Sequence, residues 1–139
     1  MVLESLSRLD QARDYYEAAL AVARELGDRR SEGQFLGYLG ALHAREARFA
    51  AAQDCLDAGE SLLRAVSDPT SLAILLCSRA EAEHLAGRPD ARGTALAEAE
   101  TMAEAVGASA DSELGHAIVR VRNLLGGMGS VGAGPADGA

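Results

Sequence analysis

The sequence predicts an all-α protein made of six helices in antiparallel pairs, and three observations lead to this prediction. Helix-stop signals recur about every 20 residues along the 139-residue chain. Between them, apolar residues are spaced by three and four, which is the spacing of one buried helix face. The pattern also repeats after about 40 residues, so that Arg8, Arg48 and Arg88 fall in register. A period of this length is typical of proteins built from stacked helix pairs.

Each predicted helix is bounded by residues that favour a stop and a new start. The predicted helices span residues 8–26, 29–46, 49–66, 69–86, 89–106 and 109–125. The breaks after them are predicted at Gly27, Ala47, Ser67, Gly87, Gly107 and Gly126. A glycine just past a helix adopts the left-handed conformation that closes it. New helices begin at the capping residues Asp28, Asp68 and Ser109, and at the first-turn prolines Pro69 and Pro89.

Both ends of the chain depart from the repeat. Ser7 and Arg8 occupy the place that a turn takes in later repeats, which predicts that residues 1–6 are the last turn of an earlier helix and that the chain is a fragment or has a late start. Residues 126–139 are rich in glycine and poor in apolar groups, so we expect a flexible tail there. The helical repeat domain is therefore predicted to cover residues 1–125.

Composition and charge narrow the function. The chain is 48% hydrophobic and only 4% aromatic, which favours helices that pack closely through small side chains. The net charge of −8 argues against nucleic-acid binding, which needs clustered positive charge. We expect neither a signal peptide nor a membrane span, because no segment has the required pattern. Cys55 and Cys77 lie in apolar surroundings without further cysteines, which indicates a reducing, cytoplasmic location.

One predicted helix pair carries a distinctive set of residues where its helices cross. These residues are Leu39, Gly40, Arg48, Phe49, Ala52, Leu56 and Gly59. With this set, the chain resembles the tetratricopeptide repeat family over about residues 7–125, in the long form of about 40 residues found in helical arms of bacterial regulators and signalling ATPases. The resemblance implies a right-handed α-solenoid of about three repeats. It also implies that a small residue at Gly40 lets two helices approach closely, while Tyr16 and Leu56 fill the space between repeats.

The resemblance further implies a groove for a partner. In this family the first helix of each pair lines a concave surface, and the third unit departs from the pattern with Arg79 and Ala80 in place of Leu and Gly. Carried over to this chain, the groove residues are Gln34, Gly37, Ala41, Arg45, Ile74, Cys77, Glu81, His84, His116 and Arg120, with Ala44, Leu85 and Asn123 beside them. Small apolar positions next to Arg and Glu favour a helix or extended peptide over a purely ionic ligand.

Two sets of residues suggest chemistry, but each has a simpler interpretation. His84, His116 and Glu81 would offer three zinc ligands if they met across the groove, yet no metal-binding spacing supports this, and we interpret them as ordinary polar residues. Cys77 and His84 are about 10 Å apart by helical rise, too far for a nucleophile and its base, so Cys77 is predicted to pack in the core. A solvated face is predicted for the acidic residues Glu98, Glu100 and Glu104.

We therefore expect a protein-interaction scaffold, with neither catalytic residues nor a cofactor, that binds a peptide or helix of a protein partner. The resemblance implies that it is the regulatory part of a larger bacterial signalling or transcription regulator. Homodimerisation is the alternative, because the first full helix carries Tyr15, Tyr16, Leu20 and Leu26 without a preceding helix to cover them. The third hypothesis, a metal-binding or enzymatic helical domain, requires bound metal at the histidines.

Overall fold

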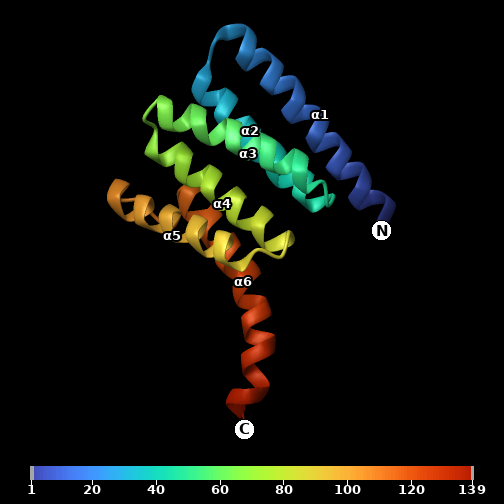
Figure 1. Cartoon of the computed structure of the whole chain (residues 1–139), viewed down its shortest axis with the longest axis vertical. Helices are drawn as coiled ribbons and strands as arrows, with labels where there is room; N and C mark the ends of the chain where they lie inside the picture. The colour runs from blue at the N-terminus through green and yellow to red at the C-terminus, as the bar shows by residue number, and fades with distance from the viewer. Residues whose placement is uncertain (1, 139) are drawn as a thin grey trace.

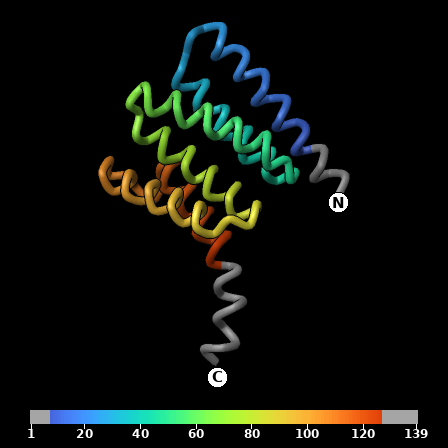
Figure 2. Tube along the Cα trace, viewed as in Figure 1, coloured from blue at the N-terminus to red at the C-terminus, as the bar shows by residue number. Residues whose placement is uncertain are grey.

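The computed structural model consists of six helices and contains no strand in the part of the chain that it describes. It describes the backbone of residues 2–138 and the side chains of residues 8–126, which are coloured in Figure 2. The helices are α1 (Val2–Leu26), α2 (Arg29–Arg45), α3 (Phe49–Ala65), α4 (Pro69–Leu85), α5 (Pro89–Val106) and α6 (Glu113–Gly138). The predicted all-α class with six helices is thus confirmed. None of the described helices is long and apolar enough to cross a membrane.

Successive helices form antiparallel pairs that lie beside one another (Figure 1). α2 packs on α3 and α4 packs on α5, while α2 and α4 join the two pairs. α1 packs on α2 at one end, and α6 packs on α4 and α5 at the other. α4 therefore contacts four helices, and most of its 17 residues are buried. Because of this central position, α4 contributes residues to the open regions on both of its sides.

The turns follow the signals read from the sequence. Positive φ angles occur at five of the predicted breaks, namely Gly27, Ala47, Ser67, Gly87 and Gly107. Asp28 and Asp68 cap α2 and α4, each accepting the backbone N–H of the serine three residues later at 3.1 Å. Hydrogen bonds from Ser31 lower the pKa of Asp28. Partial burial opposes such a shift at Asp68, but hydrogen bonds from Ser71 and the charge of Arg30 outweigh it and lower the pKa of Asp68 as well.

Three predicted boundaries are wrong. α6 begins at Glu113 rather than at residue 109, because Ser112, not Ser109, supplies the cap: its hydroxyl oxygen accepts the N–H of Gly115 at 3.0 Å. The predicted break at Gly126 is absent, since this residue lies inside α6. Arg8 lies within α1 rather than in a turn. The flexible tail predicted from residue 126 lies, from residue 127 on, outside the described side chains, and its flexibility stays a prediction.

The first helix pair packs at close range because glycines of α2 face leucines of α3. A Cβ atom at Gly40 would lie 2.6 Å from Leu56 Cγ, and one at Gly33 would lie 2.7 Å from Leu63 Cγ. Both distances are shorter than any real carbon contact, so larger side chains would push the helices apart. Gly40 therefore allows the close approach that the resemblance implies. In the second pair, alanines occupy the close contact instead, and Ala80, Ala95 and Ala99 are all buried.

Candidate functional site

The first open region is the α2–α6 groove, which α2, α4 and α6 form together. It holds two adjoining pockets of about 440 and about 390 Å³. The first pocket is lined by Tyr38, Ile74, Glu113, His116, Ala117 and Arg120. The second is lined by Arg45, Glu81, Arg120, Val121, Asn123 and Leu124. Because Arg120 belongs to both pockets, the groove is one continuous surface with a cation at its centre.

Most charges in the α2–α6 groove are already paired. Arg45 forms two hydrogen bonds to Glu81, at 2.6 and 3.1 Å, and these bonds raise the pKa of Arg45. The Glu81 side chain is only 9% exposed, so the pair neutralises a carboxylate that would otherwise be buried alone. Tyr38 donates its hydroxyl hydrogen to Glu113 at 2.6 Å. Burial and this carboxylate raise the pKa of Tyr38, so the phenol stays protonated at neutral pH.

Arg120 differs from the other charged groups of the groove. Its side chain is exposed, and among residues 8–126 no carboxylate forms an ion pair with it. Its charge reaches the neighbouring phenol, where it acts against the rise in the pKa of Tyr38. In a chain with a net charge of −8, this groove therefore offers a positive charge beside the exposed apolar side chain of Leu124, with the buried Ile74 at the base of the first pocket.

The structure brings together half of the groove residues predicted from the sequence. Those that line the α2–α6 groove are Arg45, Ile74, Glu81, His116 and Arg120. Gln34 instead donates to the Ser71 hydroxyl at 2.8 Å, which ties α2 to α4. Its amide is thereby engaged in an interhelical contact rather than in either pocket.

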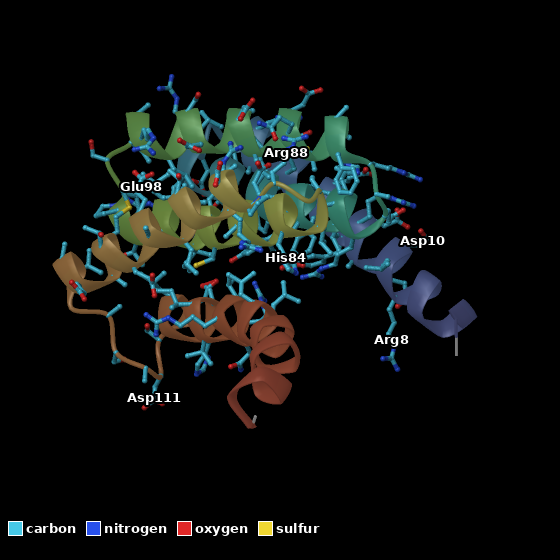
Figure 3. The ribbon with its side chains drawn as sticks, turned by 60° about the horizontal axis from the view of Figure 1, so that its bottom comes forward. Arg8, Asp10, His84, Arg88, Glu98 and Asp111 are labelled. Atoms are coloured by element: carbon cyan, nitrogen blue, oxygen red, sulfur yellow. The ribbon has the colours of Figure 1, made fainter. Side chains whose placement is uncertain are left out.

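The other predicted residues do not line either pocket. Gly37 and Ala41 are buried, and a Cβ at Gly37 would meet Leu75 of α4 at 3.2 Å. Cys77 is fully buried. His84, labelled in Figure 3, turns toward α5, where its Nδ1 lies 3.2 Å from Arg92 Nη1. The reason is the position of α4, which has helices around it, so that little of its surface remains to form a groove wall.

The described residues do not form the geometry that a Cys77–His84 catalytic pair or a zinc site at the histidines would require. Burial raises the pKa of Cys77 to about 11, so this thiol is protonated at neutral pH and is a poor nucleophile. His84 is engaged with α5 instead of Cys77. Among the described residues, no three His, Cys, Asp or Glu side chains gather into a group that could hold a metal ion. The proposed zinc ligands Glu81, His84 and His116 therefore do not form a cluster.

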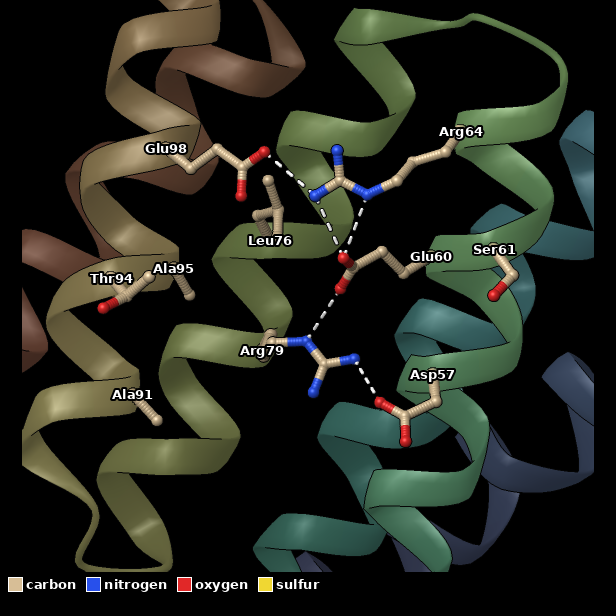
Figure 4. Close-up of a pocket in the computed structure, with 10 residues that line it drawn as sticks. All are labelled: Asp57, Glu60, Ser61, Arg64, Leu76, Arg79, Ala91, Thr94, Ala95 and Glu98. Atoms are coloured by element: carbon tan, nitrogen blue, oxygen red, sulfur yellow. Dashed lines mark hydrogen bonds and ion pairs between the residues drawn. The ribbon is translucent and has the colours of Figure 1, made fainter.

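The second open region is the α3–α5 cleft, shown in Figure 4, which has a volume of about 480 Å³. Its charged side chains form a ladder across three helices. Arg64 bonds to Glu60 at 3.0 Å and to Glu98 at 2.9 Å, which links α3 to α5. Arg79 of α4 bonds to Asp57 at 2.7 Å and to Glu60 at 3.1 Å. Both arginines are thus saturated with carboxylates, and we interpret the cleft as an interhelical brace.

Several contacts in the two open regions were not predicted from the sequence. Tyr38 and Glu113 line the groove, although the only signal for them was their spacing of four and three residues from Gln34 and His116 on the same helix faces. The ion pairs of the predicted acidic face were also not predicted. Glu98 and Glu100 are still partly exposed, but Glu98 bonds to Arg64, and Glu100 accepts a hydrogen bond from Arg122 Nε at 2.7 Å.

Comparisons of the chain with family models, with curated proteins and with solved structures give no match. The function is therefore inferred from the geometry of the two open regions.

Proposed function

We propose that this protein is an interaction scaffold whose α2–α6 groove binds a peptide or helix of a protein partner. One observation carries the proposal: two adjoining pockets share Arg120, an exposed arginine without an ion-pair partner among the described residues. A free cation between apolar walls fits a partner segment with an acidic residue next to an apolar one. The α3–α5 cleft is a weaker candidate, because both of its arginines are already paired.

The size of the groove sets the length of the bound segment. Tyr38 and Arg45 mark its two ends on α2 and are seven residues apart, which is about 10 Å of helical rise. A partner helix would present about two turns over this distance, and an extended peptide about three residues. The central contact in either case is a carboxylate at Arg120.

We also propose a wider setting for the scaffold. The register of about 40 residues and the close approach at Gly40 support tetratricopeptide-like repeats. Because proteins with such repeats often form the helical arms of bacterial regulators, we propose that this scaffold is the regulatory part of a larger bacterial signalling or transcription regulator. The two free cysteines, one of them buried, support a reducing and cytoplasmic location.

A displayed library of random peptides tests the groove. With the full chain as the target, we expect enriched peptides to pair an acidic residue with a large apolar one. Arg120→Ala is expected to weaken the best enriched peptide at least about tenfold, the effect of losing one charge-assisted contact. Binding is measured by fluorescence anisotropy of the labelled peptide.

Arg122→Ala is the matched control, because Arg122 lies on the same helix but is bonded to Glu100. It is expected to leave peptide binding unchanged. Enriched peptides that bind equally well to the Arg120→Ala variant, or a library that yields none, would contradict the assignment of this groove.

A further inference from the structure

α1 carries an apolar stripe that faces solvent, at the end of the molecule away from α6 (Figure 1). Tyr15 is 65% exposed, Val22 53% and Leu26 75%. Their spacing of seven and four residues places them on one face of the helix, with half-buried Ala19 between them. Three large apolar side chains in a row on a surface helix indicate an interaction site rather than scattered exposure. We call these four residues the α1 stripe.

The repeat itself shows what kind of element covers such a stripe. Forty residues along the chain, Tyr15 and Val22 correspond to Cys55 and Leu62 of α3. Those two side chains pack against a cluster of three buried leucines, which α1 and α2 supply: Leu20, Leu36 and Leu39. Within the described chain, α1 packs only on α2, and the stripe lies on its other side. The position is therefore built to receive helices that present leucine.

The charges beside the α1 stripe select among possible occupants. Asp14 and Glu25 border one side of it, both are exposed, and no cation pairs with either among residues 8–126. Arg24 is engaged with Glu32 at 3.1 Å, and Arg13 with Asp10 and Glu46. Arg8 lies at the far end and points away from the other helices in Figure 3. Among the described residues, the border of the stripe therefore carries two unpaired carboxylates, one near each of its ends.

A second copy of this chain fits the α1 stripe poorly. In an antiparallel α1–α1 pair, twofold symmetry places the two acidic borders on the same side, so that carboxylate faces carboxylate. Head-to-tail stacking is not favoured either, because the exposed face of α6 carries His116, Val119 and Asn123, with a single large apolar residue rather than a row of leucines. The two ends of the molecule are not complementary.

We propose that the α1 stripe docks an amphipathic helix of another protein, with leucines on its apolar face and basic residues along one border. The leucines of the partner helix would cover the α1 stripe in the way that Leu36 and Leu39 of α2 cover Cys55 and Leu62 of α3. The basic border meets Asp14 and Glu25, which are eleven residues apart, or about 16 Å along the helix. Two basic residues about three turns apart on the partner helix would reach both carboxylates. This site is independent of the α2–α6 groove.

A peptide with the sequence of residues 29–45 is the probe. It carries the leucines that cover α3 in the intact chain, and it begins with Arg29 and Arg30. We expect the labelled peptide to bind the full-length chain, with binding weakened at least tenfold by Val22→Glu and about threefold by Asp14→Asn together with Glu25→Gln. Arg29 and Arg30 are adjacent and can reach only one of the two carboxylates, so a peptide with both replaced by Glu is expected to bind more weakly than the parent peptide.

The control variant is Val119→Glu, which changes a 46% exposed valine on α6 and is expected to leave peptide binding unchanged. Circular dichroism checks that each variant keeps the helical content of the parent. Absence of peptide binding, or binding that Val22→Glu does not weaken, overturns the proposal. Sedimentation equilibrium of the chain alone gives a further check: a monomer is expected, whereas a dimer that Val22→Glu dissociates would assign the stripe to a second copy.

Discussion

The two central helix pairs, α2–α3 and α4–α5, have matching helix lengths and turns but are held to their neighbours by different forces. Leu39 of α2 is 3% exposed and belongs to an apolar cluster with Leu20 of the preceding helix α1. Forty residues on, Arg79 of α4 stands in the place of Leu39, and Glu60 of α3 stands in the place of Leu20. Arg79 and Glu60 form an ion pair at 3.1 Å.

This comparison shows that a repeat keeps its geometry when both partners of a contact change together. An arginine at position 79 alone would be buried next to apolar surface, which costs several kcal/mol without a partner. Glu60 and Asp57 supply the partners, and the Arg79 side chain is only 14% exposed. An apolar contact in one repeat and an ionic contact in the next therefore occupy equivalent positions.

The largest expected effect separates the glycine contact of the first pair from open glycine positions. Gly40→Leu would force α2 and α3 apart, because Leu56 Cγ lies 2.6 Å from the new Cβ, and we expect a loss of about 3 kcal/mol in the free energy of unfolding. Urea denaturation followed by circular dichroism measures it. Gly93→Leu is the control, since nothing lies within 4 Å of a Cβ there. Equal stability of the Gly40→Leu variant and the parent would show that the two helices are paired wrongly.

An intermediate effect on the free energy of unfolding is expected when the ionic contact of the second pair is replaced by the leucine contact of the first. Arg79→Leu removes an ion pair from Glu60, whose side chain is only 26% exposed, and is expected to cost about 1 to 2 kcal/mol, whereas Asp57 is exposed and is solvated by water instead. The double variant Glu60→Leu/Arg79→Leu recreates the residues of the first pair, and we expect its stability to lie within about 1 kcal/mol of the parent. Thermal melts of the parent, of the single variants Arg79→Leu and Glu60→Leu, and of the double variant, at low and high salt, give the coupling energy. If the two single losses simply add, the contacts at the two positions are not equivalent.

The smallest effect concerns the turns inside the two pairs. The first pair turns at Ala47 with φ of 60°, whereas the second turns at Gly87 with φ of 75°. Only glycine adopts this region without strain, so Ala47→Gly is expected to raise the free energy of unfolding by about 0.5 kcal/mol and Gly87→Ala to lower it by about 1 kcal/mol. Differential scanning calorimetry resolves both shifts. A stabilising Gly87→Ala change would contradict this account.

Local signals predicted the elements well, because each helix end depends on a few adjacent residues. The caps at Asp28 and Asp68 and the helix breaks at Ala47 and Ser67 were placed correctly, and the structure adds that both break residues are left-handed although neither is glycine. The start of α6 was missed because Ser109 and Ser112 are equally good caps in the sequence. Local chemistry alone does not decide between two such serines.

The groove was predicted less completely, because its residues depend on how each helix is rotated against its neighbours. Arg45 and Glu81 were both predicted to line the groove, but the sequence did not predict that they bond to each other, because they are 36 residues apart in the chain. Cys77 and Gly37 were placed in the groove and are buried, since a helix pattern gives the period of a face and not which neighbour covers it. That Arg120 has no ion-pair partner among the described residues could not be predicted, because this depends on the position of every carboxylate around it.

The enclosure of α4 has a consequence for how the chain comes apart. A terminal helix such as α1 can fray while its neighbours stay folded, because among the described helices its backbone lies against α2 alone. α4 touches α2, α3, α5 and α6, so losing any one of them uncovers part of the same apolar surface. We therefore expect α4 and these four neighbours to unfold cooperatively, with the slowest amide hydrogen exchange in α4.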